Sequence, residues 1–264
     1  MKIPFTKMHG AGNDFIVVDD RALTFPVDDP VFMARICARR TGVGSDGIIL
    51  LQPSDSADLR MRFINPDGHE VGMCGNGARC FARRAYDLGA VPEKMTIEAQ
   101  AGIVHAEVLG DTICLTLTEP TDWRMGLDVG LERLADFVNT GVEHVVVRVE
   151  DLGGLDIQSV GCQIRHHDLF APAGANANFM KVEADGTLSL RTYERGVEAE
   201  TLACGTGAVA AALVAERQGW VDLPVAVHCA GGYDLSVDSD AGGTTLSGGA
   251  ATVFEGEVEY GNWI

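Results

Sequence analysis

The chain has 264 residues, of which 46% are hydrophobic and 22% charged, a balance typical of a folded globular protein and not of a disordered one. Asp and Glu number 38 against 20 Lys and Arg, so the net charge of −18 argues against nucleic acid or an anionic membrane as a partner. The longest apolar run, Ala208–Ala215, is too short to span a bilayer.

The seven cysteines form no CxxC or other close pair, which argues against a zinc ribbon or a thioredoxin-type motif. The first ten residues carry Lys and His where a signal peptide would have an apolar core. The neighbouring His166 and His167 lack a second ligand pair at helical spacing, so we expect no metal site there. These features predict reduced thiols in a cytoplasmic protein.

Apolar runs and alternating segments predict the secondary structure. In chain order, the expected strands are Phe15–Val18, Ile48–Leu51, Leu59–Ile64, Val104–Leu117, Val145–Val149, Phe179–Val182, Leu188–Tyr193 and Val225–Val237. Helical patterns are Val31–Arg40, the stretch after Cys74, Gly126–Asn139 and the stretch after Cys204. Because strands outnumber helices and many are joined by hairpin-sized turns, we expect an α+β fold with mainly antiparallel sheet.

An internal repeat relates the two halves of the chain. The segment from Cys74 to Gly89 aligns without a gap on the segment from Cys204 to Gly219, and seven of the sixteen positions are identical. A separation of 130 residues is too long for a solenoid, whose repeats are about 20–50 residues. The repeat therefore indicates two similar half-chains that face each other, although two Gly/Ala-rich helix starts could also match by chance.

Each repeat predicts a helix that begins directly after a cysteine. Glycines at a helix start leave backbone N–H groups open to a ligand, at the positive end of the helix dipole. The same position lowers the pKa of a thiol from about 8.5 to roughly 3.5–7.5. Two such thiols could remove a proton from one face of a carbon and return one to the other, which is racemisation or epimerisation. The alternative for either cysteine alone is a buried structural thiol.

The chain resembles the diaminopimelate epimerase family nearly from end to end. The motifs that carry the resemblance occur in the family's order: Phe5–Phe15, Gly42–Gly47, Asn65–Gly68, Met73–Gly77, Ala175–Phe179, Glu194–Gly196 and Glu200–Gly207. The resemblance implies a cofactor-independent isomerase that interconverts the LL and meso forms of 2,6-diaminopimelate, for lysine and peptidoglycan precursor synthesis. It also implies two pseudo-symmetric halves, each a curled sheet around a central helix, with the active site in the cleft between them.

The resemblance assigns roles residue by residue. Cys74 and Cys204 match the acid and base, and His144 and Glu194 match residues that bind the α-amino group and assist the thiols. The matched substrate-binding residues are Asn13, Asn65, Gly75, Asn76, Asn176, Glu194, Arg195, Gly205 and Thr206. We expect the first half to cover 1–117, completed by a last strand at about 252–264, and the second half to cover 118–251.

One departure from the family pattern leaves the substrate class open. Val142-Glu143 stands where many relatives have Asn-Pro, so a racemase of another free amino acid, such as histidine, is the alternative substrate class. A non-catalytic amino-acid-binding protein is the remote alternative. The GxGxxG match at Gly42–Gly47 lies between a helical and a strand-like segment, the reverse of a dinucleotide fingerprint, so we expect Asp46 to stabilise a turn. A homodimer is left open.

Overall fold

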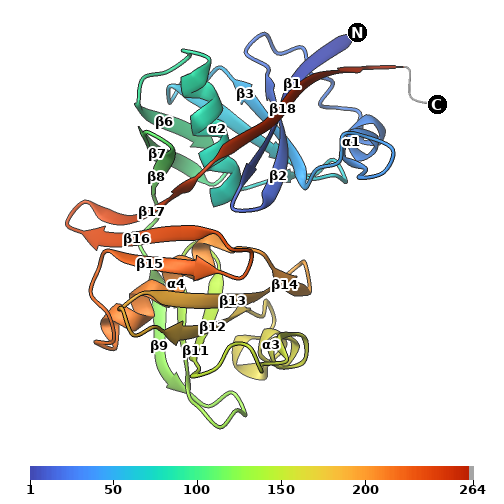
Figure 1. Ribbon diagram of the computed structural model, residues 1–264. Helices are drawn as coiled ribbons and strands as arrows, with labels where there is room; N and C mark the ends of the chain where they lie inside the picture. Colours follow the sequence, from blue (N-terminus) through green and yellow to red (C-terminus); the bar gives the residue numbers. More distant parts are fainter. Residues whose placement is uncertain (262–264) are drawn as a thin grey trace. The chain divides into compact units, whose positions relative to one another are not determined.

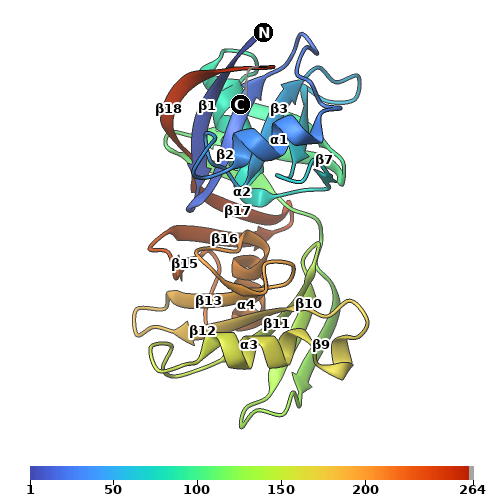
Figure 2. The same cartoon turned by 90° about the vertical axis from the view of Figure 1, so that its right-hand side faces the viewer.

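The computed structural model describes residues 1–261, and the chain divides into two compact units (Figures 1 and 2). Unit 1 contains Met1–Leu115 and the residues from Gly248 onward, and unit 2 contains Thr116–Ser247. The chain leaves unit 1 within β8 (Thr112–Thr116) and returns to it within β17 (Gly243–Gly249). Unit 1 is therefore built from both ends of the chain.

Unit 1 is a mixed sheet with two helices. Its strands, in spatial order, are β18 (Ala251–Glu259), β1 (Lys2–Gly10), β2 (Asn13–Asp19), β3 (Gly47–Gln52), β4 (Leu59–Ile64), β6 (Lys94–Ala99) and β7 (Gly102–Leu109). Neighbours pair antiparallel except β2–β3 and β4–β6, which are parallel. The short β5 (Glu70–Val71) adds to β4, and the helices are α1 (Pro30–Cys37) and α2 (Gly75–Asp87). The expected last strand at about 252–264 overlaps β18, and its residues 262–264 lie outside the described residues.

Unit 2 repeats this pattern of pairing. Its strands, in spatial order, are β9 (Thr121–Leu127), β10 (Ala135–Asn139), β11 (Glu143–Arg148), β12 (Asn176–Val182), β13 (Leu188–Glu194), β15 (Val225–Cys229) and β16 (Asp234–Asp240). Only β11–β12 and β13–β15 are parallel, and β14 (Ala199–Thr201) adds to β13 as β5 adds to β4. The helices are α3 (Ile157–Arg165), α4 (Gly205–Arg217) and the short η1 (Asp168–Phe170). The α+β fold and the two similar halves are confirmed.

In each unit one helix lies inside the curl of the sheet and another covers its outer face. Helix α2 packs against β1 to β4 and β7, and α4 packs against β10 to β13, β15 and β16. The apolar stretch Ala208–Ala215 is almost entirely buried, because its small side chains let the surrounding strands approach α4 closely. Helix α3 packs on the opposite side of β12 and β13.

Covering both faces explains why the central strands are continuous apolar runs. In β11, Val145 and Val147 belong to the cluster under α3, so alternation along the strand turns His144 and Val146 to the α4 side. In β12, Phe179 belongs to the α3 cluster, and alternation places Asn176 and Asn178 on the α4 side. Polar residues are thereby placed beside the helix that begins after Cys204.

One predicted helix is wrong. The segment Gly126–Asn139 contains the end of β9 and all of β10, and both Gly126 in β9 and Gly130 in the connection have positive φ. An apolar stretch buried on both faces cannot be distinguished from a helix by periodicity alone. The first helix is shorter than predicted and ends at Cys37, and α3 was not anticipated although Asp156 caps its first turn.

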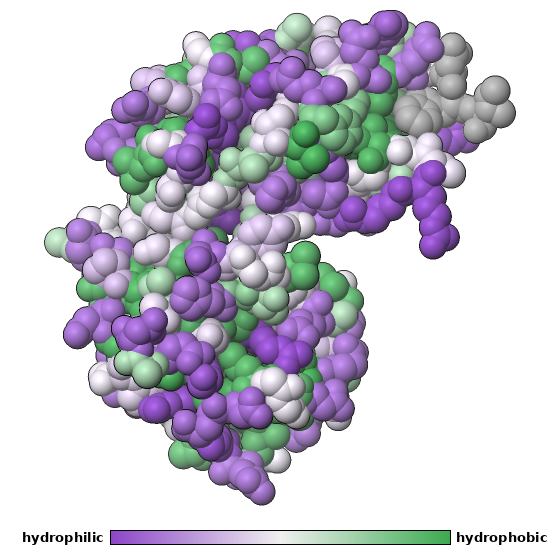
Figure 3. Space-filling model, in the orientation of Figure 1, coloured by the Kyte–Doolittle hydropathy of each residue, from purple (hydrophilic) through white to green (hydrophobic). Residues whose placement is uncertain are grey.

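The face shown in Figure 3 is mainly polar. Hydrophilic residues are spread over the visible face of each unit, with smaller hydrophobic patches among them (Figure 3). Within residues 1–261, no helix has both the length and the apolar character needed to cross a membrane.

Candidate active site

Helices α2 and α4 both begin immediately after a cysteine. Cys74 and Cys204 are the N-cap residues, each with an extended backbone, at φ −139° and −120°. The first backbone N–H groups of a helix have no partner within the helix, so each helix start offers hydrogen-bond donors at the positive end of its dipole. All seven cysteines are free thiols. Each unit therefore presents one thiol beside a set of amide donors.

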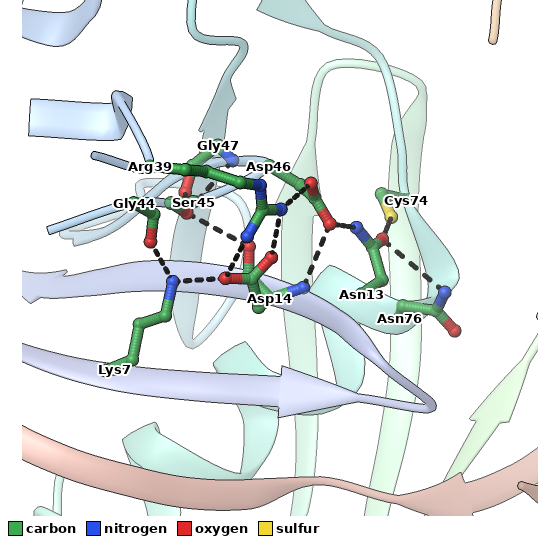
Figure 4. A network of polar contacts seen from close by, with 10 residues as sticks. All are labelled: Lys7, Asn13, Asp14, Arg39, Gly44, Ser45, Asp46, Gly47, Cys74 and Asn76. Carbon is green, nitrogen blue, oxygen red and sulfur yellow. Dashed lines mark hydrogen bonds and ion pairs between the residues drawn. The ribbon is translucent and has the colours of Figure 1, made fainter. Parts of the chain in front are cut away.

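In unit 1, the Cys74 thiol lies against a side-chain amide (Figure 4). Its Sγ is 3.6 Å from Asn13 Oδ1, and Asn76 Nδ2 is 3.5 Å from the same oxygen. The amide nitrogen of Asn13 donates to Asp46 Oδ2 at 2.5 Å. Parallel pairing of β2 with β3 brings Asp46 beside the start of β2, where its backbone N–H donates to the Asp14 carbonyl. Asp46 therefore does more than stabilise a turn, because it anchors a contact of Cys74.

Behind this contact lies a cluster of four charged side chains. Arg39 Nη2 lies 2.7 Å from Asp14 Oδ1 and 2.5 Å from Asp46 Oδ1. The nearly buried Lys7 ammonium donates to the Asp14 carboxylate and to the Gly44 carbonyl (Figure 4). Burial alone would raise the pKa of Asp14, but hydrogen bonds from Arg39 and Lys7 lower it to about 2. Asp14 is therefore ionised at neutral pH.

In unit 2, a hydrogen-bonded chain leads from Cys204 to a buried histidine. Thr206 Oγ1 lies 3.6 Å from Cys204 Sγ and 2.9 Å from His144 Nε2. On the other side of the ring, Asn178 Nδ2 lies 3.0 Å from Nδ1. The Asn178 amide is oriented by Thr192, whose hydroxyl donates to Oδ1 at 3.0 Å, so its nitrogen donates to Nδ1 and the histidine proton lies on Nε2. Burial lowers the pKa of His144 to about 3, so the ring is neutral.

The Cys204 thiol is protonated in this environment. Burial raises its pKa, and the nearby Glu194 carboxylate raises it further. The Thr206 hydroxyl and the Gly207 amide act in the opposite direction but are the smaller effects. Burial also raises the pKa of Glu194. A cation bound beside Glu194 would offset its charge and make the Cys204 thiolate easier to form.

A third cluster holds Asn176, Arg195 and Glu143. The Asn176 side chain accepts from the Arg195 backbone N–H at 2.8 Å and donates to the Glu143 carbonyl at 3.2 Å. The Arg195 guanidinium forms an ion pair of 2.8 Å with the Glu143 carboxylate. Glu143 is therefore in direct contact with one of the predicted substrate-binding residues.

The structure brings most predicted residues into contact within their own unit. Asn13, Cys74 and Asn76 meet in unit 1; Cys204, Thr206 and His144 meet in unit 2, where Asn176 also meets Arg195. Gly75 and Gly205 open the two helices. Asn65 closes the turn from β4 to β5 through its backbone, where its N–H donates to the His69 carbonyl and its carbonyl accepts from the Gly68 N–H.

Two contact residues were missed from the sequence. Asn178 lies two positions after Asn176 on one strand, so strand alternation could have placed both on the same face. Arg79, fully buried in α2, donates to Asn76 Oδ1 at 2.7 Å. No sequence signal distinguished Arg79 from Arg83 and Arg84 of the same helix, which are only partly buried.

The family is shown by comparison with known proteins. The model of the diaminopimelate epimerase family matches residues 5–121 and again residues 137–253, one match for each repeat. The chain belongs to the diaminopimelate epimerase family. Diaminopimelate epimerase of Aquifex aeolicus is 41% identical over 96% of this chain and 97% of its own length, and that of Archaeoglobus fulgidus is 40% identical over 97% and 96%.

Solved structures outside this family share the fold. A phenazine biosynthesis protein of the PhzF family from Bacillus anthracis has a TM-score of 0.72 at 21% identity, covering 98% of this chain and 99% of its own. A probable proline racemase from Agrobacterium radiobacter has a TM-score of 0.68 at 18% identity, covering 98% and 93%. Among residues 1–261, no group of three or more His, Cys, Asp or Glu side chains is placed to hold a metal ion.

Proposed function

We propose that this chain is a diaminopimelate epimerase, an isomerase that converts LL-2,6-diaminopimelate to the meso form in lysine and peptidoglycan precursor synthesis. The observation that carries the proposal is the repeated helix start, with Cys74 at one and Cys204 at the other, in a chain of this family. Inverting one carbon requires an acid and a base on opposite faces, and each unit supplies one thiol.

The helix starts supply the stabilisation that the reaction needs. Removing the α-proton of a free amino acid leaves a carbanion whose charge spreads onto the carboxylate. Backbone N–H groups at the starts of α2 and α4, fixed before the reaction begins, would stabilise that charge as it develops. We propose that Gly75, Asn76, Gly205 and Thr206 provide these donors, and that the pocket alone performs the chemistry, without a cofactor.

The electrostatics of Cys204 suggest how its thiol is activated. Without substrate, burial and Glu194 keep the thiol protonated. We propose that the substrate's α-ammonium binds beside Glu194, offsets its charge and allows the thiolate to form only when substrate is present. His144 contacts Thr206 and not the sulfur, so it supports Cys204 by orienting the Thr206 hydroxyl.

The remote end of the substrate is assigned to Asn13, Asn65, Asn176 and Arg195. Support comes from the Asn176–Arg195 contact, whereas Asn13 lies beside Cys74 and can reach the substrate from there. The Glu143–Arg195 ion pair supports a second candidate function, racemisation of another free amino acid. A substrate carboxylate bound at Arg195 would have to share the guanidinium with Glu143.

Proton NMR of LL-diaminopimelate in D2O, with reduced and pyridoxal-free enzyme, tests the proposal directly. Loss of the α-proton signal together with formation of the meso isomer is the expected result. No exchange with this substrate, but exchange with histidine or another amino acid, would favour the alternative racemase. Binding of these amino acids without exchange of the α-proton of any of them would favour a non-catalytic binding protein.

Alanine at Cys74 or Cys204 is expected to lower turnover by at least about a thousandfold while the protein stays folded, because either change removes one of the two proton-transfer groups. Matched controls are Cys80→Ala, on the same helix as Cys74, and Cys162→Ala in unit 2. Both should keep turnover within about threefold, since Cys162 contacts His166 outside the candidate site and Cys80 is a buried thiol six residues after Cys74. Full activity in either single variant at Cys74 or Cys204 would refute the two-thiol mechanism.

The seven free thiols suit a reducing compartment, and we propose that the enzyme acts in the cytoplasm. A homodimer is its proposed assembly, which sedimentation equilibrium would test.

A further inference from the structure

Two side-chain amides lie in series between opposite charges in unit 1. At one end, the fully buried Arg79 donates from Nη2 to Asn76 Oδ1 at 2.7 Å. Asn76 Nδ2 then lies 3.5 Å from Asn13 Oδ1, and Asn13 Nδ2 donates to Asp46 Oδ2 at 2.5 Å. Figure 4 shows the last two contacts and the Cys74 sulfur beside them. The chain of contacts thus begins at a cation and ends at an anion.

These charges determine which way each amide points. A guanidinium can only donate, so the amide next to Arg79 must turn its oxygen toward it. An ionised carboxylate can only accept, so the amide next to Asp46 must turn its nitrogen toward it. Reversing either amide would place two donors or two acceptors against each other. Asp46 is itself held by Arg39 Nη2 at 2.5 Å and by the Asp14 backbone N–H at 3.2 Å.

The direction of the Asn13 amide decides what the Cys74 sulfur meets. With its nitrogen on Asp46, Asn13 turns its oxygen to Sγ, 3.6 Å away. An oxygen acceptor beside sulfur favours the protonated thiol, whereas an amide N–H there would favour the thiolate.

We propose that Asp46 and Arg79 are positioning residues for Cys74, which set the two amides so that the Asn13 oxygen holds Cys74 as a proton-donating thiol. In the reaction, the Cys74 S–H bond breaks, its proton forms the new C–H bond on the substrate carbanion, and the electron pair stays on sulfur. The resulting thiolate faces the Asn13 oxygen, which favours its return to the thiol. This catalytic consequence rests on the proposed function, whereas the orientation of the amides does not.

Net charge near the thiol does not explain the arrangement by itself. The charged side chains of this part of unit 1 are Lys7 on β1, Asp14 on β2, Arg39 and Asp46 in the segment before β3, and Arg79 on α2. Three are cationic and two are anionic. Removing the Asp14 charge and removing the Asp46 charge are therefore comparable changes, but only Asp46 touches the Asn13 amide.

The test measures the reaction of Cys74 with iodoacetamide between pH 6 and pH 9, in the full-length protein. Trypsin cuts at Arg62 and Arg79, so Cys74 and Cys80 fall on different peptides for mass spectrometry. Asp46→Asn offers an NH2 group where a carboxylate oxygen stood, which lets the Asn13 amide reverse. Cys74 alkylation at pH 7 is expected to rise about tenfold, the effect of exchanging an acceptor for a donor at sulfur.

Asp14→Asn is the matched control, since it removes one negative charge from the same cluster and leaves the Asp46–Asn13 hydrogen bond in place. Its alkylation rate should stay within about twofold of the parent protein. If Asp46→Asn fails to fold, Asn13→Leu removes the oxygen directly and is expected to raise the rate in the same way. An unchanged rate in the folded variant, or an equal rise in Asp14→Asn, would overturn the proposal.

The result is independent of the proposed reaction. An unchanged alkylation rate with loss of turnover in Cys74→Ala would defeat the positioning role and leave the function intact. A raised rate with full turnover in Cys74→Ala would support the orientation of the amides and defeat the two-thiol mechanism.

Discussion

Glu143 places a carboxylate on the guanidinium that the proposed function assigns to the substrate. Its ion pair with Arg195 is 2.8 Å long, and both side chains are about a third exposed or less, at 32% and 26%. An ion pair this exposed stabilises by about 1 kcal/mol at most, so a substrate carboxylate can displace or share it. Glu143 therefore sets how strongly Arg195 attracts an anion.

Glu143→Gln is expected to lower KM for diaminopimelate up to about fivefold with little change in kcat, because the competing charge is removed and the side-chain length is kept. Steady-state kinetics measure both constants. Glu150→Gln, at a surface pair with Arg133, is the control and should leave both unchanged. A rise in KM in Glu143→Gln would instead indicate that Glu143 binds the substrate's remote ammonium.

His144 predicts a pH dependence of stability. The ordinary pKa of 6.5 applies in the unfolded chain, and burial lowers it to about 3 in the folded protein. Below pH 6.5 the unfolded chain therefore takes up a proton that the folded protein does not, and stability falls by about 1.4 kcal/mol per pH unit toward pH 3. Between pH 7 and pH 5, His144 alone should account for a loss of about 2 kcal/mol.

His144→Gln removes this titration while keeping a donor that can reach Thr206. Urea unfolding at pH 7 and pH 5 is expected to show a smaller acid-induced loss in the variant than in the parent, by about 2 kcal/mol. The same loss in both proteins would show that His144 does not titrate as the buried ring implies.

The sequence predicted the site residues that carry local signals. Cys74 and Cys204 stand at helix starts within a repeat, where short-range pattern and chemistry agree. The partners that orient them could not be predicted, because Asp46 reaches Asn13 across a parallel strand pair 33 residues apart. Asn178 reaches His144 across 34 residues in the same way. Strand pairing of this kind is set by tertiary packing and leaves no local pattern.

At the scale of the element, the third helical residue of α2 and α4 is a glycine with different surroundings in the two units. A Cβ on Gly207 would lie 2.4 Å from Asn178 Oδ1, an atom fixed by its hydrogen bond with Thr192. A Cβ on Gly77 would meet Ile49 Cδ1 at 3.1 Å, the movable end of an apolar side chain. Equivalent positions of the repeat therefore differ in how much space they leave.

Gly207→Ala is expected to destabilise unit 2 by about 2 kcal/mol and to lower kcat, because the new methyl group displaces Asn178 from His144. Gly77→Ala should be nearly neutral, since a gain of up to about 1 kcal/mol in helix propensity offsets a small shift of Ile49. Thermal unfolding and turnover of the two variants provide the comparison. A larger loss in Gly77→Ala than in Gly207→Ala would contradict this account.

The elements that were predicted well are those with one clear period or a terminal signal. The helix predicted after Cys74 is α2, and the predicted strands Ile48–Leu51 and Leu59–Ile64 lie inside β3 and β4. The error at Gly126–Asn139 has the opposite cause. In β10, Ala135 and Phe137 belong to the cluster under α3, and Asp136 and Val138 on the opposite face are buried too, so packing on both faces removed the alternation that marks a strand.

At the scale of the whole molecule, the internal repeat predicted the two similar halves, and the resemblance supplied the curled sheets. The spacing of the repeat does not predict that each unit is completed by a strand that follows the other unit in the sequence. Strand β18 follows β17 of unit 2 in the sequence but pairs with β1 in unit 1. Strand β9 follows β8 of unit 1 but pairs with β10 in unit 2.

Truncation after Gly249 tests how much unit 1 depends on β18. The strand pairs with β1 from Lys2 to His9, and Val258 is buried against the core under α1. Hydrogen exchange of the β1 amides is expected to accelerate at least about tenfold in the truncated chain, because those amides lose their partners and unit 1 opens. The α4 amides serve as the internal reference and should be unchanged. Equal protection of β1 in both chains would show that unit 1 closes without its last strand.

The discontinuity of unit 1 also fixes an order of events during synthesis. A ribosome releases residues 116–247 before it releases β18, so unit 2 can complete its sheet while unit 1 still lacks an edge. The half of the protein that is translated second is therefore the first that can finish folding, and the surroundings of Cys204 are complete before those of Cys74. Until β18 emerges, β1 offers an unpaired edge to any neighbouring nascent chain, and pairing with β18 is what closes it.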